Sequence, residues 1–311
     1  MILVFIENKT YLTKVLSYLD EANLPYTTDL EREHEILVVA ENSNKVKALI
    51  QENVTKKIIF LTELEEPKLI KHMSKNTKSG KNYLLQIRRL FNQCDRIVVT
   101  MPSMLKLLKK RCKREIIVLP RELPIINISK SNKDIYEKYH LQKRSKRILI
   151  IDYHYEHLDY VHALAGTYPK EQFILLGYQP EYLMSHKNKD LYHTLPKNVV
   201  KQKYLDFNLY SDLSKVAWLV IYFYAGELSN CYLDITLLLK RQLLIEYHLY
   251  YQDYFVNSKN AYLFGSQEEL LLRFKKLMED RVANLTDNGY DLIAGNTHKK
   301  IIQKWAQIIT F

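Results

Sequence analysis

Residues 91–120, FNQCDRIVVTMPSMLKLLKKRCKREIIVLP, alternate between strand and helix patterns. Two short runs rich in Val and Ile, 96–100 and 115–119, predict buried strands. Between them, residues 103–113 carry apolar side chains at helical spacing and predict a helix. A helix between two strands returns the chain so that the strands run parallel. The stretch therefore predicts a parallel sheet built from βαβ units.

The same alternation extends over the rest of the chain. Further strands are predicted at 2–6, 35–40, 57–61, 147–152, 172–177, 198–201, 217–223 and 242–246. Further helices are predicted at 11–24, 42–51, 81–93, 156–165, 208–215, 234–240, 267–279 and 297–309. Periodicity is lost after Pro120, around Pro124 and a cluster of Ser, Asn and Lys. We predict an α/β chain with two tandem Rossmann-like, doubly wound domains and an expected ligand cleft between them.

The predicted organisation has two domains, a linker and a terminal helix. Residues 1–125 form the first domain, 126–145 a linker, 146–295 the second domain and 296–311 a terminal helix. The length of 311 residues and the apolar fraction of 47% suit two folded domains. Three widely spaced cysteines indicate neither a disulfide framework nor a metal site, which favours a cytoplasmic setting. The longest apolar stretch, 217–226, has about half the length of a membrane span.

Positive charge is concentrated in one segment. The net charge is +11, yet residues 68–114 alone contain fourteen Lys or Arg and a single acidic residue, Asp95. This asymmetry predicts an anionic partner, and two cationic amphipathic helices in the segment favour an anionic membrane surface. The residues predicted to bind it are Lys81, Arg88, Arg89, Lys106, Lys109, Lys110, Arg111, Lys113 and Arg114. The alternative is that both apolar stripes face the core and the lysines are solvated. The polar run 71–81 is interpreted as a loop.

Several function classes are excluded by what the chain lacks. The first glycine is Gly80, so no glycine-rich phosphate loop follows the first strand, and NAD-dependent and P-loop chemistry are set aside. The 24 tyrosines lie mostly away from the cationic segment, which argues against nucleic acid. His154 and His157 are too few for a zinc site, so no metal is expected.

Three stretches resemble the GT-B glycosyltransferases, and especially their retaining, nucleotide-sugar-dependent branch that includes bacterial glycolipid synthases. They are residues 91–120, residues 172–182 (QFILLGYQPEY) and residues 224–247 (YAGELSNCYLDITLLLKRQLLIEY). The resemblance implies a nucleotide sugar as co-substrate, no further cofactor, and a last helix that crosses back to the first domain. It also implies a first domain that presents the acceptor and a second domain that binds the donor.

The resemblance carries over to individual donor-binding residues. Gly177 would lie in the turn after a donor-domain strand, Glu227 would bind the sugar and Asp234 the ribose. His154 or His157 would face phosphate, because residues 152–159 lack the Arg and Lys of the family. Glu227 and Asp234 have six residues between them, one fewer than in the family. A solvated loop residue at Glu227 and a helix-dipole role for Asp234 remain open.

Two functional hypotheses follow. The first is a cytoplasmic, peripherally membrane-associated glycosyltransferase that transfers a sugar from a nucleotide sugar to a membrane-associated or glycan acceptor. The alternative is a non-catalytic GT-B-like scaffold, or a partner subunit of an active glycosyltransferase, because three family features are missing or altered. The sequence identifies no catalytic residue.

Overall fold

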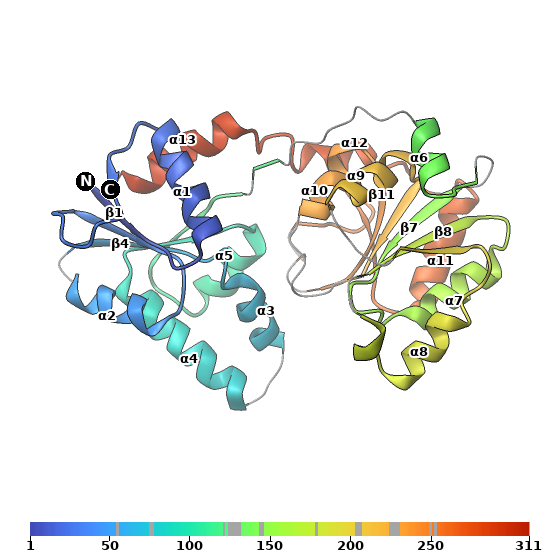
Figure 1. The fold of residues 1–311 in the computed structure, drawn as a ribbon, viewed down its shortest axis with the longest axis horizontal. Helices are drawn as coiled ribbons and strands as arrows, with labels where there is room; N and C mark the ends of the chain where they lie inside the picture. Colours follow the sequence, from blue (N-terminus) through green and yellow to red (C-terminus); the bar gives the residue numbers. More distant parts are fainter. Residues whose placement is uncertain are drawn as a thin grey trace. The chain divides into compact units, whose positions relative to one another are not determined.

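The chain divides into two compact units, each with its own sheet. The computed structural model describes residues 1–53, 56–74, 78–120, 122–123, 132–142, 146–177, 180–202, 207–223, 231–248, 251 and 254–310. Unit 1 comprises Met1–Glu122 and Asn296–Phe311, and unit 2 comprises Leu123–Gly295. Each unit is an α/β fold with helices on its sheet (Figure 1).

Unit 1 contains a six-stranded, wholly parallel sheet in the order β2-β1-β3-β4-β5-β6. Its strands are β1 (Ile2–Phe5), β2 (Tyr26–Thr27), β3 (Ile36–Val39), β4 (Lys57–Leu61), β5 (Arg96–Val99) and β6 (Glu115–Val118). Its helices are α1 (Lys9–Glu21), α2 (Asn44–Glu52), α3 (Glu66–Ser74), α4 (Lys78–Gln93), α5 (Pro102–Lys109) and α13 (His298–Ile309).

The two ends of the chain meet on one face of this sheet. Helices α1 and α13 pack against each other and against the sheet, as Figure 1 shows at the upper left. The apolar stripe of α13 supplies the contact, with Ile301, Trp305 and Ile308 each 1% exposed. Asn8 begins α1 by accepting a hydrogen bond from the backbone N of Tyr11. Burial of this stripe is what holds the last helix on unit 1.

Unit 2 contains a second six-stranded parallel sheet, in the order β12-β11-β10-β7-β8-β9. Its strands are β7 (Arg147–Ile151), β8 (Gln172–Leu176), β9 (Val199–Gln202), β10 (Leu219–Tyr222), β11 (Gln242–Glu246) and β12 (Tyr262–Phe264). Its α-helices are α6 (Asn132–Lys138), α7 (Leu158–Thr167), α8 (His186–His193), α9 (Phe207–Val216), α10 (Cys231–Leu238), α11 (Gln267–Met278) and α12 (Thr286–Asp291). A short 3-10 turn, η1, spans Glu181–Leu183.

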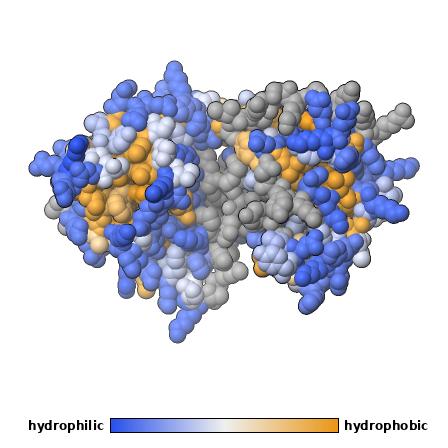
Figure 2. Space-filling model, in the orientation of Figure 1, coloured by the Kyte–Doolittle hydropathy of each residue, from blue (hydrophilic) through white to orange (hydrophobic). Residues whose placement is uncertain are grey.

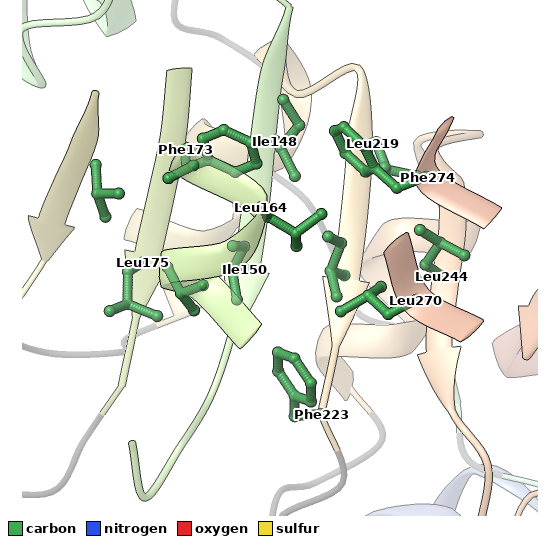
Figure 3. Close-up of a cluster of buried hydrophobic side chains, with 14 of the residues drawn as sticks. Ile148, Ile150, Leu164, Phe173, Leu175, Leu219, Phe223, Leu244, Leu270 and Phe274 are labelled. Atoms are coloured by element: carbon green, nitrogen blue, oxygen red, sulfur yellow. The ribbon is translucent and has the colours of Figure 1, made fainter. Parts of the chain in front are cut away.

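The central strands of unit 2 are apolar after the first residues of β7 and β8, Arg147 and Gln172, because helices cover both faces of a doubly wound sheet. On one face Leu164 of α7 meets Leu270 and Phe274 of α11 above the sheet (Figure 3). Phe223, just after β10, lies at the rim of this cluster. The apolar core therefore reaches the edge of the sheet where β10 ends.

The predicted fold class is confirmed, and one local prediction is wrong. The polar run 71–81 is expected from its composition to be a loop, but α3 continues to Ser74 and α4 begins at Lys78, while residues 75–77 lie outside the described residues. Gly80 lies inside α4 and is buried, so this glycine is a small residue in a packed helix and not a break. Helix α6 lies within residues assigned to the linker and packs against α9.

Candidate functional site

The strand order of the second sheet reverses between β7 and β10. From β7 the chain adds β8 and β9 on one side, and then β10, β11 and β12 on the other. In open parallel sheets, ligands bind at such a reversal, beyond the carboxyl ends of the strands. Asp152 directly follows β7, and Phe223 directly follows β10. This edge of unit 2 is the candidate site.

The buried carboxylate of Asp152 holds the turn that follows β7. Its Oδ1 accepts a hydrogen bond from the backbone N of Glu156 at 3.1 Å, and its Oδ2 accepts one from the backbone N of His157 at 2.8 Å. These amides lead into α7. In a glycine-rich loop, amides at this place face a phosphate. Here a side chain of the same turn occupies them.

His157 lies between two carboxylates and against an aromatic ring. Its Nδ1 is 3.5 Å from Asp152 Oδ1, and its Nε2 is 3.5 Å from Oε1 of Glu246, the last residue of β11. The imidazole stacks on Phe223 with the ring centroids 4.3 Å apart and the planes at 5°. Tyr160 meets both rings edge-on, at 5.5 and 5.6 Å. We call these five residues the His157 cluster.

The carboxylates decide the charge of the imidazole. Burial lowers the pKa of His157, but the hydrogen bonds and charges of Asp152 and Glu246 outweigh burial and raise this pKa to about 10. His157 is therefore protonated at neutral pH. Residues 152–159 contain no Arg or Lys, and the protonated His157 supplies a positive charge there, with one of its two carboxylates contributed by the distant strand β11. The one positive charge of His157 lies beside two carboxylates, those of Asp152 and Glu246.

Gly177 directly follows β8, and its lack of a side chain is required by the turn after β7. A Cβ at this position would lie 2.3 Å from Cζ of Tyr155 and 2.8 Å from the backbone O of Asp152. Tyr155 has a φ of 52°, and its backbone O accepts a hydrogen bond from Asn188 Nδ2 at 2.8 Å. The structure therefore gives Gly177 a packing role beside Asp152, and donor contact by Gly177 stays a prediction.

The other predicted donor residues are placed as follows. His154 is half-buried and meets Tyr153 edge-on at 4.8 Å. Asp234 is 8% exposed in the first turn of α10, and its charge adds to the burial that raises the pKa of Tyr254. Glu227 lies outside the described residues. The ligand roles of all three stay predictions.

Unit 1 has a corresponding edge, where its strand order reverses between β1 and β3. Glu41, after β3, accepts hydrogen bonds from the backbone N of Glu7 at 3.1 Å and of Asn8 at 2.7 Å. These amides precede α1, so a carboxylate again occupies the amides ahead of the first helix. After β4 and β5, the buried Glu66 accepts hydrogen bonds from Thr62 Oγ1 at 2.8 Å and the backbone N of Thr100 at 2.7 Å.

A small pocket lies at the carboxyl ends of β4 and β5, under α1 and α13. Its volume is about 20 Å³, the room of about one water molecule. Lys14 pairs with Glu63 at 3.3 Å, and Tyr18 donates a hydrogen bond to Glu122 at 2.9 Å. Burial, followed by the hydrogen bond to Glu122, raises the pKa of Tyr18. Trp305 also lines the pocket. The pocket is too small for a sugar ring.

The cationic segment presents its charges outward and its apolar stripes inward. All nine predicted anion-binding side chains are exposed: Lys81, Arg88, Arg89, Lys106, Lys109, Lys110, Arg111, Lys113 and Arg114. The buried side chains of the stripes are Ile87, Leu90 and Phe91 on α4 and Met104 and Leu108 on α5. The side chains along α4 are predominantly hydrophilic at the lower edge of unit 1 in Figure 2. The stripes therefore stabilise unit 1 and are not free to enter a bilayer.

Two details refine this surface. Leu85 is 49% exposed on α4, in the same turns as Lys81, Arg88 and Arg89. Arg114 donates a hydrogen bond through Nε to the backbone O of Asn92 at 3.0 Å, so part of its side chain supports the end of α4. The surface combines exposed cations with one exposed leucine.

The sequence did not identify Phe223 or Glu246 as site residues. For Glu246, the available signal was a charged residue that directly follows the apolar run Leu243–Ile245 at the end of a predicted strand. What makes it a site residue is the order of the strands, which brings the end of β11 near the turn after β7.

Within the described part of the chain, no group of three or more His, Cys, Asp or Glu side chains could hold a metal ion. Likewise, no helix among the described residues has both the length and the apolar character to cross a membrane.

Comparisons with known proteins give structural likeness only. No protein-family model matches the chain, and no curated protein matches its sequence. The structure is similar to WaaG, a glycosyltransferase involved in lipopolysaccharide biosynthesis, with a TM-score of 0.62, 14% identity and 100% of each chain covered. It is also similar to HepE from Anabaena in complex with UDP and glucose, with a TM-score of 0.66 and 13% identity over 98% of this chain and 90% of that one.

A third likeness is to a chain of the GtfA/B complex, with a TM-score of 0.65 and 11% identity over 90% of this chain and 57% of that one. Identities this low show the fold and nothing further. Two six-stranded parallel sheets of this topology, matched over the whole length of WaaG and 90% of HepE, show that the chain has the GT-B fold.

Proposed function

We propose that the protein is a glycosyltransferase that takes a sugar from a nucleotide-sugar donor and transfers it to a membrane-associated or glycan acceptor. The observation that carries this proposal is the His157 cluster at the strand reversal of unit 2, in a fold shared with glycosyltransferases. HepE, which has this fold, was solved with UDP and glucose. Fold alone does not determine function, so the donor site requires a direct test.

Unit 2 would bind the donor. The residues we propose to face it are Gly177, His154, Asp234 and Glu227. Asp234 is a nearly buried carboxylate on the helix after β10, which suits an acceptor for ribose hydroxyls. No metal ion and no further cofactor are part of the proposal. Stabilisation of the negative charge on the departing diphosphate would supply most of the rate.

Unit 1 would face the acceptor and an anionic membrane surface. The exposed cations of α4 and α5 are the support for this part of the proposal. Each basic residue near an anionic leaflet contributes about 1 kcal/mol, so three engaged residues supply about 3 kcal/mol. Leu85 would add apolar contact among the charges. The protein would then be a peripheral membrane protein on the cytoplasmic side.

A second candidate is a partner subunit without activity of its own. Its support is that Asp152 occupies the amides ahead of α7, where a phosphate could otherwise bind, and that the structure resembles a chain of the GtfA/B complex. In that case the protein would bind no donor nucleotide and would form a stoichiometric complex with an active transferase.

A thermal-shift screen against UDP, GDP and their sugars separates the two candidates. A ligand at about 100 times its dissociation constant adds about 2.7 kcal/mol to the stability of the folded state, which is readily measured. We expect one nucleotide to stabilise the protein and Glu227→Ala to abolish donor turnover. A folded protein that responds to none of the panel would favour the partner subunit, and full turnover in the variant would remove Glu227 from the site.

The membrane part is tested by co-sedimentation with vesicles that contain anionic or only zwitterionic lipid. The triple variant K81E/R88E/R89E should lose at least about 100-fold in affinity for the anionic vesicles, since three attractive charges are removed and three repulsive charges are added. A matched control, K259E/K275E/K276E, makes the same charge change on exposed lysines of unit 2. Equal losses in both variants would mean that net charge, and not this surface, governs binding.

A further inference from the structure

Glu246 is a carboxylate at the carboxyl end of β11, adjacent to the strand that marks the reversal of the sheet. Its side chain is 26% exposed, whereas that of Asp152 in the same cluster is 3% exposed. Asp152 is engaged by two backbone amides inside its own turn. Of the two carboxylates beside His157, Glu246 is therefore the one that a ligand can reach.

His157 determines how Glu246 is held. Its Nε2 lies 3.5 Å from Glu246 Oε1, while Nδ1 points to Asp152 on the other side of the ring. The stack on Phe223 and the edge contact with Tyr160 hold the plane of the imidazole. A ring held on four sides constrains the oxygen that it contacts, so the carboxylate of Glu246 is oriented before any ligand arrives.

The charge of the cluster selects the ligand chemistry. Two carboxylates against one imidazolium leave excess negative charge, which disfavours a phosphate at this place. An ionised carboxylate only accepts hydrogen bonds, and its two oxygens can accept from two neighbouring donors. Neutral hydroxyls fit both conditions, and hydrogen bonds to a charged acceptor are the stronger kind.

We propose that Glu246 binds a pair of neighbouring hydroxyls of the nucleotide-sugar donor, and that His157 is the positioning residue for its carboxylate. This inference rests on the proposed function, because it names a contact within the same donor site. The hydroxyls belong either to the ribose or to the transferred sugar. A free nucleotide contains the ribose alone, whereas a sugar nucleotide contains both.

The first test measures calorimetric affinities of wild type, Glu246→Gln and a control, Asp190→Asn, for UDP, GDP, UDP-glucose and GDP-mannose. Asp190 is an exposed acidic residue on α8. We expect E246Q to weaken binding about 10-fold to 100-fold and D190N to leave it unchanged. A loss for the free nucleotide as well as its sugar identifies the ribose, and a loss for the sugar nucleotide alone identifies the transferred sugar. Affinities within twofold of wild type for every probe would overturn the role of Glu246.

The second test asks whether His157 acts through Glu246. We expect His157→Gln to weaken binding about 5-fold to 10-fold in the wild-type background and less than twofold in the E246Q background. Equal losses in both backgrounds would make His157 a structural residue and overturn its positioning role. If wild type binds none of the probes, the proposed function fails, and this inference is overturned with it. Binding by wild type that E246Q retains would overturn the inference alone.

Discussion

The edges of the two sheets where the strand order reverses have the same topology and different chemistry. In unit 1 the amides before α1 bind the carboxylate of Glu41, which comes from the neighbouring strand β3. In unit 2 the amides before α7 bind Asp152, from the same turn, and His157 and Glu246 extend the cluster outward. Among the described residues at these two edges, unit 2 adds a half-buried, protonated histidine, His157, beside the carboxylate. The comparison shows that the parallel fold determines where a site can form, and that individual side chains determine which charges and hydrogen-bonding groups it contains.

The largest expected effect is that of removing Asp152, the carboxylate of unit 2 that corresponds to Glu41 in unit 1. Asp152→Ala leaves the backbone amides of Glu156 and His157 without an acceptor and the His157 imidazole with Glu246 as its remaining carboxylate. It should lower the free energy of unfolding of unit 2 by about 3 to 5 kcal/mol, since each unsatisfied amide costs about 1 to 3 kcal/mol. The two tryptophans, Trp218 in unit 2 and Trp305 in unit 1, allow each unit to be followed separately. In a W305F background, urea unfolding monitored by Trp218 fluorescence measures the loss. A loss below about 1 kcal/mol would contradict the role assigned to Asp152.

The next effect concerns two glycines of unit 2, whose replacement by alanine should act in opposite directions. Gly177→Ala forces a Cβ into the ring of Tyr155 and the backbone of Asp152 and should cost about 1 to 3 kcal/mol or more. Gly166→Ala, in α7, meets no atom within 4 Å and should stabilise the helix by about 0.5 to 1 kcal/mol. The same fluorescence assay tests both variants. If both variants change the free energy of unfolding by the same amount, the turn that holds Tyr155 and Asp152 can accommodate a Cβ at position 177.

The next effect should depend on pH. The pKa of His157 is raised in the folded state to about 10, so protonated His157 stabilises unit 2 fully below about pH 6.5, its unfolded value. The stabilisation then declines as the pH rises toward 10. The difference in unfolding free energy between wild type and His157→Gln should follow that course. A difference that is constant from pH 6 to 10 would show that His157 is not held protonated.

The smallest effect is expected in unit 1. Glu41 is only half-buried, and a glutamine retains one acceptor oxygen for the two amides, so Glu41→Gln should cost about 0.5 to 1.5 kcal/mol. Unfolding followed by Trp305 fluorescence in a W218F background measures it. A cost as large as that of D152A would remove the distinction between the two edges.

Prediction from sequence was most successful where local pattern and burial agree. The strand predicted at 242–246 has the observed bounds of β11, and most other strands differ by one or two residues. Prediction was least successful where a residue is compatible with two structures. Gly80 stands in a polar run that predicts a loop, but it lies buried in the packed helix α4. The candidate site was predicted in part: the turn that holds His154 and His157 was singled out, while Glu246 was not.

The sequence by itself determined the α/β class, the parallel sheets and the cationic surface. The physical reason is that continuous apolar runs and helical stripes encode which faces are buried, and charge composition needs no three-dimensional information. Only the tertiary structure decided the charge of His157, the need for a glycine at Gly177 and the inward direction of the stripes on α4 and α5. Each of these depends on contacts between segments far apart in the chain. His157 and Glu246 are separated by three strands in sequence and by 3.5 Å in space.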